Sequence, residues 1–384
     1  MLKRLSISLV LLIAPATPLI SQWLPDPEVD ETIQRGIGFI YNLEFENAEK
    51  EFARVVSLRP DHPLGYFFQA MTEWWRILTD LDNEARDERF YEMLETVIAM
   101  CDKKLETNPN DVTALFFKGG SIGFRGRLRA NRGSWLAAAR DGVAALPIVR
   151  RAYELDPNNS DILLGIGIYN YYAEVVPQEY PLMKPVMWFF PNGDKKKGLE
   201  QLQQASENGK FAHIESSYFL MQNYFFYEKQ YDKALALAQK LTRLFPRNPV
   251  FLRYLGRSHV RLGYWPEAYR VFFQIDKYCH DNQIGFTQSD EREAAYYMAR
   301  FQFIGTDLEE SLRQFLRCDE LSQTLDKGET SGFMTMANLH IGMIYDFQKK
   351  RSLAIMQYQK VLKMKVFENS HKDARRYLNK PYTR

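Results

Sequence analysis

Hydrophobic side chains recur at helical spacing along most of the chain. Between Glu44 and Pro60 the apolar positions lie three or four residues apart, namely Phe45, Ala48, Phe52, Val55 and Val56. This spacing places side chains on one face of an α-helix, and proline stops the helix because it has no backbone N–H. The alternation typical of a strand is missing, and short aromatic runs fit helices better. The pattern predicts an all-helical protein.

The same positions return every 34 residues. Residues 29–62 form the first unit, with Gly36 and Phe39 in its first helix. The later copies are residues 215–248 (Phe225, Ala234, Pro246), 249–282 (Gly256, Ala268, Phe272), 292–325 (Ala299, Ser311, Phe315, Cys318) and 335–368 (Gly342, Tyr345, Ala354, Tyr358). A fixed period of this length indicates stacked helical hairpins rather than one compact core.

Prolines mark three further units in the middle of the chain. Pro60, Pro109 and Pro157 are 49 and 48 residues apart, and each is followed ten residues later by a small residue, respectively Ala70, Gly119 and Gly167. Small residues let two helices approach closely. We therefore expect three longer hairpins, followed near the C-terminus by a short closing helix from Ser370 to Leu378.

The repeated positions resemble those of the tetratricopeptide repeat, whose 34-residue unit combines small, aromatic and proline positions in this order. The resemblance implies a right-handed α-solenoid of about eight such hairpins, three of them elongated. We expect a linker at 22–28, elongated units over 29–214, regular units over 215–368, and a capping helix and tail over 369–384. A single hairpin cannot bury its own apolar face, so each must pack on its neighbours.

The N-terminus differs from the rest of the chain. Lys3 and Arg4 precede an apolar run from Leu5 to Ile13, and a segment of small residues and prolines follows up to Ser21. These are the three regions of a secretory signal peptide, and the apolar run is too short to span a bilayer. We expect residues 1–21 to be a signal peptide, with Gln22 as the first mature residue. The predicted location is the periplasm or cell envelope.

Length and charge narrow the function classes. The 384 residues exceed the ~250–300 at which one hydrophobic core stops growing. Fifty Lys and Arg oppose 48 Asp and Glu, and removal of Lys3 and Arg4 makes the balance even. A neutral chain argues against a nucleic-acid partner. The resemblance to tetratricopeptide repeats implies a protein or peptide partner, and peripheral membrane contact is a further expectation.

Candidate chemistry is sparse. Gly119 to Gly123 matches the GxSxG pattern around Ser121, but the pattern lies in a predicted helix and lacks the preceding strand. The six histidines lack metal-binding spacing, and Cys101, Cys279 and Cys318 read as small buried side chains, with one Cys279–Cys318 bridge as the alternative. We expect no catalytic residue, metal or cofactor. A small-molecule-binding or hydrolytic enzyme in the middle units is retained as an alternative.

In tetratricopeptide-repeat proteins, partners usually lie in a concave groove lined by the first helix of each unit. Carried onto this chain, the lining in the early units is Ile37, Ile40, Phe67, Met71, Trp74, Phe116, Leu164 and Tyr171. In the later units it is Asn223, Arg253, Arg257, Arg261 and Arg300. These arginines either bind an acidic segment or a C-terminal carboxylate of a partner, or pair with internal carboxylates such as Glu215 or Glu293.

Two further segments are candidate binding surfaces. Between the helices of the third unit, the chain has a cluster comprising Arg125, Arg127, Arg129, Arg132, Arg140 and Trp135. It either binds phosphate or lipid head groups or forms a solvated turn. Residues 175–193 carry four prolines around Met187, Trp188, Phe189 and Phe190, and form either an exposed docking loop or an internal plug.

The predicted function is that of an exported scaffold or adaptor that binds a protein or peptide partner in its groove. The alternative is an envelope-associated assembly factor that touches the membrane through residues 175–193.

Overall fold

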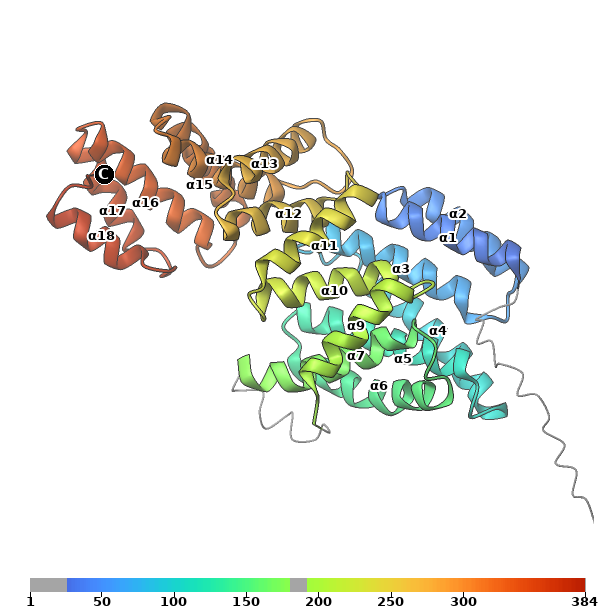
Figure 1. Ribbon diagram of the computed structural model, residues 1–384. Helices are drawn as coiled ribbons and strands as arrows, with labels where there is room; N and C mark the ends of the chain where they lie inside the picture. Colours follow the sequence, from blue (N-terminus) through green and yellow to red (C-terminus); the bar gives the residue numbers. More distant parts are fainter. Residues whose placement is uncertain (1–25, 180–191, 384) are drawn as a thin grey trace, which may run out of the picture.

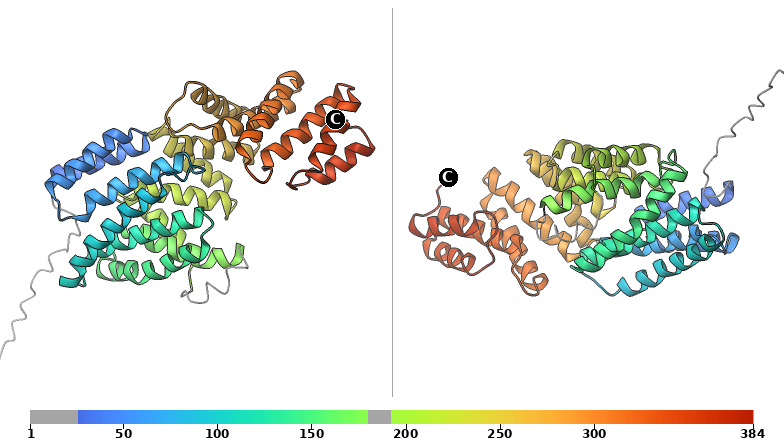
Figure 2. Two further views of the ribbon diagram at one scale, coloured as in Figure 1. Left: turned by 180° about the vertical axis from the view of Figure 1, so that it is seen from behind. Right: turned by 90° about the horizontal axis from the view of Figure 1, so that it is seen from below.

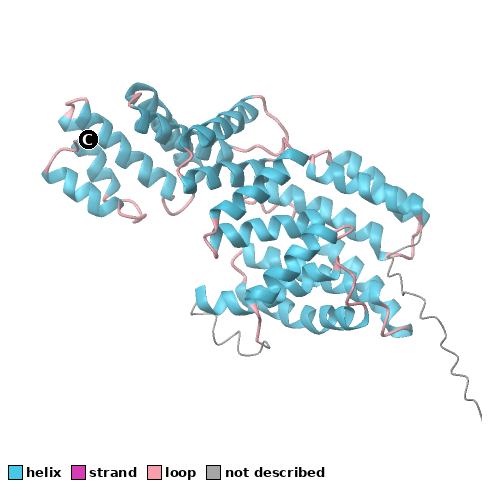
Figure 3. Cartoon of the chain, viewed as in Figure 1, coloured by secondary structure: helices cyan, strands magenta, loops and turns pink. Residues whose placement is uncertain are grey.

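The computed structural model describes residues 26–179 and 192–383, and every regular element in these two ranges is a helix (Figures 1 and 3). The expected signal peptide and Met187 to Phe190 lie outside the described residues. Consecutive helices pair as hairpins. The first four pairs are α1 (Pro27–Tyr41) with α2 (Phe45–Leu58), α3 (Pro63–Thr79) with α4 (Asp87–Thr107), α5 (Val112–Asn131) with α6 (Trp135–Leu155), and α7 (Ile162–Glu179) with α9 (Lys195–Asn208).

Four more pairs and a closing helix complete the chain. The pairs are α10 (His213–Phe226) with α11 (Tyr231–Leu244), α12 (Pro249–Leu262) with α13 (Trp265–His280), α14 (Gln288–Gly305) with α15 (Leu308–Leu325), and α16 (Gly332–Phe347) with α17 (Arg351–Val361). The closing helix is α18 (Ser370–Asn379). The prediction of eight hairpins and a short final helix is therefore confirmed.

Three of the hairpins share one close contact between their two helices. Gly256 in α12 faces the ring of Phe272 in α13, and a Cβ atom at Gly256 would lie 2.7 Å from that ring. Gly342 faces Tyr358 in the same way, at 2.6 Å. Gly36 faces Phe52 in the first hairpin. In each of these three hairpins the glycine and the aromatic residue that it accommodates are 16 positions apart.

The middle hairpins are elongated, as predicted. Helices α4 and α6 each contain 21 residues and α5 contains 20, whereas α10, α11 and α12 contain 14. Gly119 lies against Val149 of α6, and Gly167 lies against the backbone of Gly198 in α9. We expected residues 175–193 to form a loop, but their first part belongs to a helix, because α7 continues through Pro177 to Glu179. The three cysteines are free thiols in this structure.

The first six hairpins do not form an open spiral. Tyr41 at the end of α1 packs on two rings that are distant in the sequence. Phe245, directly after α11, lies at a ring-centroid distance of 5.2 Å, and Phe251 of α12 lies at 6.2 Å. The Asn248 side-chain amide donates to the Tyr41 carbonyl at 3.0 Å. Figure 1 shows the end of the first hairpin meeting α12, and α3 also contacts α12, so the solenoid closes on itself. Helices α14 to α18 extend from this closed ring as an arm (Figure 1).

One pair of substitutions tests the small-residue contact. Gly36→Ala should lower the free energy of unfolding by about 1–3 kcal/mol, because the new methyl group collides with the buried Phe52 ring. Gly38→Ala in the same helix should raise it by about 0.5–1 kcal/mol, because no atom lies within 4 Å of the added methyl. Urea denaturation of both variants provides the measurement. Equal effects at the two positions would contradict this account of the repeat.

Candidate partner-binding site

A buried ion pair lies at the centre of the closed ring. Arg127 near the end of α5 donates from Nη1 to Glu215 Oε1 in α10 at 3.0 Å. The second carboxylate oxygen of Glu215 accepts from the Tyr41 hydroxyl at 3.4 Å and from the Trp75 indole at 3.3 Å. Burial raises the pKa of Glu215, and the Arg127 charge acts in the opposite direction. The pair joins helices from the first, second, third and fifth hairpins.

Aromatic rings enclose the Arg127 guanidinium. Its central carbon lies 4.1 Å from the ring centroid of Phe219, 5.0 Å from that of Trp74 and 5.4 Å from that of Tyr218. Its Nη2 donates to the Gln222 side chain at 3.1 Å, and Gln222 in turn donates to the hydroxyls of Tyr218 and Tyr254. This inner network fills the concave side of the early hairpins with the protein's own polar groups.

The expected arginine cluster is not a loop. Helix α5 continues through Asn131, so Arg125, Arg127 and Arg129 belong to its last turns. Asp141 of α6 pairs with both Arg125 and Arg129, at 2.6 and 2.7 Å. Asp87 pairs with Arg132 at 2.6 Å, and Trp135 at the start of α6 is 51% exposed. Four of these arginines therefore have carboxylate partners inside the chain, counting Arg127 with Glu215.

Ring closure also buries the aromatic residues expected in the early groove. Trp74 and Tyr171 are fully buried, and Phe116 is half-buried. The Tyr171 hydroxyl donates to Glu228 at 2.8 Å, and the Tyr172 hydroxyl donates to the Asn223 side chain at 2.7 Å. In this closed structure these side chains contribute to the core. Their role in partner binding stays a prediction.

The arginines expected in the later groove lie on α12 and α14, where Arg261 is exposed and the other three are half-buried. We call Arg253, Arg257, Arg261 and Arg300 the concave row. Arg253 pairs with Asp290 at 3.1 Å, and Arg257 forms a two-pronged pair with Glu293, with both N–O distances at 2.5 Å. Arg257 therefore pairs with Glu293 inside the chain, as one of the two interpretations of the sequence predicted. Glu215, the other expected carboxylate, is bound by Arg127 instead.

The two outer members of the concave row have no such partner. Arg261 lies over the Tyr231 ring at 5.9 Å, and Arg300 lies over the Trp265 ring at 5.6 Å. Arg300 also donates to the Tyr296 hydroxyl at 3.3 Å. Within residues 26–179 and 192–383, no carboxylate pairs with Arg261 or Arg300. Both guanidinium groups can therefore bind an anionic group from outside the chain.

Asn223 adds an unsatisfied donor to the same face. Its side chain is fully buried, its oxygen is occupied by the Tyr172 hydroxyl, and its Nδ2 has no acceptor in the structure. The Nε atoms of Arg253 and Arg300 are likewise shielded from water without an acceptor. Buried polar atoms without a hydrogen-bond partner are uncommon, and here they include the acceptor Asp290 Oδ1 of α14 as well as these donors.

Three observations identify the fold: the eight hairpins, the 34-residue period and the glycine–aromatic contacts. The chain has the tetratricopeptide-repeat fold. No protein-family model matches the sequence, and no curated protein matches it. Similar solved structures include PilF of Pseudomonas aeruginosa, with 13% identity, 67% of this chain and 96% of that chain covered, and a TM-score of 0.44. Yeast Tom70 is 11% identical, with 89% of this chain and 86% of that chain covered and a TM-score of 0.38. Human IFIT1 with PPP-AAAA is 15% identical, with 92% of this chain and 85% of that chain covered and a TM-score of 0.41.

The structure also shows where the candidate nucleophile Ser121 lies and whether the described residues form a metal site or a membrane span. Ser121 lies fully buried in α5, and its hydroxyl forms no hydrogen bond with the described residues. The described part of the chain has no cluster of three or more side chains that could hold a metal ion. Among the same residues, no helix is long and apolar enough to cross a membrane.

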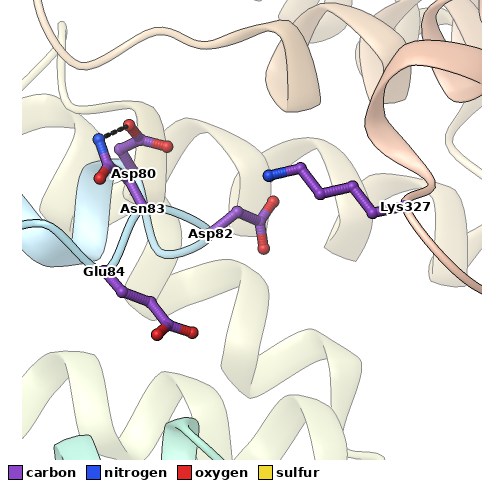
Figure 4. Close-up of a pocket in the computed structure, with 5 residues that line it drawn as sticks. All are labelled: Asp80, Asp82, Asn83, Glu84 and Lys327. Atoms are coloured by element: carbon purple, nitrogen blue, oxygen red, sulfur yellow. Dashed lines mark hydrogen bonds between the residues drawn. The ribbon is translucent and has the colours of Figure 1, made fainter.

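The turn between α3 and α4 forms an open, acidic hollow of about 490 Å³ that also includes Lys327 of the arm (Figure 4). Asp82 and Glu84 extend from the turn, and the Asn83 amide donates to Asp80 at 3.1 Å. Asp82 also accepts from Ser289 at 3.2 Å. The hollow thus lies where the ring and the arm meet, and its acidic groups are held by contacts within the chain.

Removal of Arg127 should open the ring. Arg127→Ala leaves Glu215 buried without its cation and should lower the free energy of unfolding by about 3–5 kcal/mol in urea denaturation. The double variant Arg127→Met with Glu215→Gln buries no unpaired charge, so it should lose less than the single variant. If the double variant lost more than Arg127→Ala, the ion pair would not be the closing interaction.

Stability of the repeat arm should depend on pH through His340. Burial and the Arg300 charge lower the pKa of His340 to about 3, and its ring packs on Phe315 at 4.9 Å. An unfolded histidine titrates near 6.5, so the unfolded state takes up the proton first as the pH falls. The contribution of neutral His340 is complete above about pH 6.5 and should fall by about 1.4 kcal/mol per pH unit towards pH 3.

Substitution separates this effect from other titrations. The glutamine of His340→Gln does not titrate. When both proteins are denatured in urea between pH 6.5 and pH 3, the free energy of unfolding of the wild type should therefore fall relative to that of the variant by about 1.4 kcal/mol per pH unit. A difference that is constant from pH 7 to pH 4 would show that His340 titrates normally.

Proposed function

We propose that this chain is an exported tetratricopeptide-repeat scaffold or adaptor that binds an acidic segment of a protein or peptide on its concave row, in the periplasm or cell envelope. The observation that carries the proposal is the pair Arg261 and Arg300, whose charges no carboxylate of residues 26–179 and 192–383 compensates. The N-terminal pattern of Lys3, Arg4 and the apolar run supports export.

The chemistry of the row favours an anionic partner. Arg253, Arg257 and Arg261 follow each other every four residues on α12, where like charges repel by about 0.2–0.5 kcal/mol per pair. Asp290 and Glu293 of α14 offset two of these charges. The carboxylates of a partner would offset the charges of Arg261 and of Arg300 on α14. Arginine suits this role because its planar donors match a carboxylate.

A fractionation and capture experiment tests the proposal. The full chain with a C-terminal tag is expressed in a bacterium with two membranes, and it should appear in the periplasmic fraction with Gln22 as its first residue. Cross-linking there should capture a partner, and Arg261→Glu with Arg300→Glu should reduce its recovery at least about tenfold, because each reversal turns attraction into repulsion.

A matched variant controls for net charge. Arg243 and Arg270 are exposed on the second helices α11 and α13, so their change to Glu alters the total charge equally but should leave capture intact. Equal recovery with both double variants would retire the concave row as the binding site. A chain that remains in the cytoplasm at full length would refute export.

A further inference from the structure

The last hairpin has a charge unlike that of the rest of the chain. Residues 349–384 contain eleven of the 50 Lys and Arg residues but only two of the 48 Asp and Glu residues, namely Glu368 and Asp373. This segment therefore carries +9, and the rest of the chain carries −7. Such a difference between parts of one molecule creates a local electrostatic field that the overall sum conceals.

The positive charges cover the free end of the solenoid, formed by α17, the loop 362–369 and α18 (Figures 1 and 2, red). Four of the cations have carboxylate partners: Arg351 with Asp346, Lys360 with Asp319, Lys365 with Glu329, and Arg376 with Asp373. The exposed cations Lys363, Lys372, Arg375 and Lys380 pair with no carboxylate of the described chain. We call these four side chains the basic end.

An apolar loop tip lies between members of the basic end. Val366 is 59% exposed and Phe367 is 45% exposed, directly after Lys363 and Lys365. The loop is held firmly, because the Lys365 backbone N–H donates to Thr330 at 2.8 Å and the Phe367 N–H donates to Ser370 at 3.1 Å. The two apolar side chains are therefore presented in a fixed position.

The adjoining face of α17 is also partly apolar. Leu353 is half-exposed and Met356 is largely exposed, whereas the terminal unit of a solenoid needs a polar outer face for solubility. Cations around exposed apolar residues are typical of elements that lie on a lipid surface, where the charges meet anionic head groups and the apolar tip enters the interface.

We propose that the basic end docks this protein on the surface of an anionic phospholipid membrane. Val366 and Phe367 enter the interfacial layer, while Lys363, Lys372, Arg375 and Lys380 contact the head groups. The cations are spread over the loop 362–369, the helix α18 and the residue that follows it, and three of the four are lysines, which act as point charges rather than as two-pronged ligands. A diffuse anionic surface fits this arrangement better than a single carboxylate does. The proposal does not depend on the concave row.

Vesicle sedimentation tests the proposal. The chain without residues 1–21, whose own apolar run would bind lipid, is mixed with vesicles of phosphatidylcholine alone or of equal parts phosphatidylcholine and phosphatidylglycerol. It should sediment only with the anionic vesicles, and added salt should release it. Lys363→Glu with Lys372→Glu and Arg375→Glu should weaken binding at least about tenfold. Val366→Ser with Phe367→Ser should weaken it several-fold, since the apolar tip no longer enters the interface.

A charge-matched variant and a folding check complete the design. Lys50, Lys103 and Lys196 are exposed on α2, α4 and α9, and their change to Glu should leave vesicle binding nearly unaltered. Circular dichroism should show that all variants keep their helices. Equal binding to both kinds of vesicle, an equal loss in the matched variant, or association with an acidic protein or with itself but not with lipid would overturn the proposal.

Discussion

The contact between Arg127 and Glu215 fixes the shape of this solenoid. In a simple repeat array each hairpin contacts only its neighbours, and nothing determines where the superhelix ends. Here a cation from the third hairpin meets a carboxylate from the fifth, and the carboxylate also bonds to Tyr41 and Trp75 from the first two. The concave side of the early hairpins is therefore closed by helices of the same chain.

The ion pair and the aromatic core contribute differently to closure of the ring. A buried pair contributes little net stability, because removal of both charges from water is costly. The packing of Tyr41 on Phe251 and of Trp75 on Tyr218 supplies buried apolar area instead. The directional bonds of Arg127 and Glu215 select one register among the alternatives that apolar packing alone would allow. Closure then leaves the concave row as the accessible part of the face.

The sequence predicts what is local and misses what is distant. Gly36 and Phe52 lie in one hairpin, so a fixed 16-residue offset shows the contact directly. Arg127 and Glu215 are 88 positions apart, and a one-dimensional repeat frame describes only adjacent units. The glycines of α5 also suggested a break before Arg127. Two of them instead continue the helix and pack on α6, where Gly119 meets Val149 and Gly126 meets Asp141.

The candidate site shows the same limit. The helical spacing identified Arg253, Arg257, Arg261 and Arg300 as one face, but it could not tell which of them are compensated. That depends on whether a carboxylate of the next hairpin reaches them, and α14 supplies two carboxylates for three arginines of α12. The expectations for Met187 to Phe190 and for export involve residues outside the described structure, and they stay predictions.

Desolvation explains where charge remains available in a chain of almost no net charge. A guanidinium shielded from water needs an anion beside it, and Arg125, Arg127, Arg132 and Arg257 each have one. Charges that stay in water need no such partner, because water itself solvates them. Uncompensated cations therefore collect at the surface, on the outer part of the concave row and at the solenoid's end.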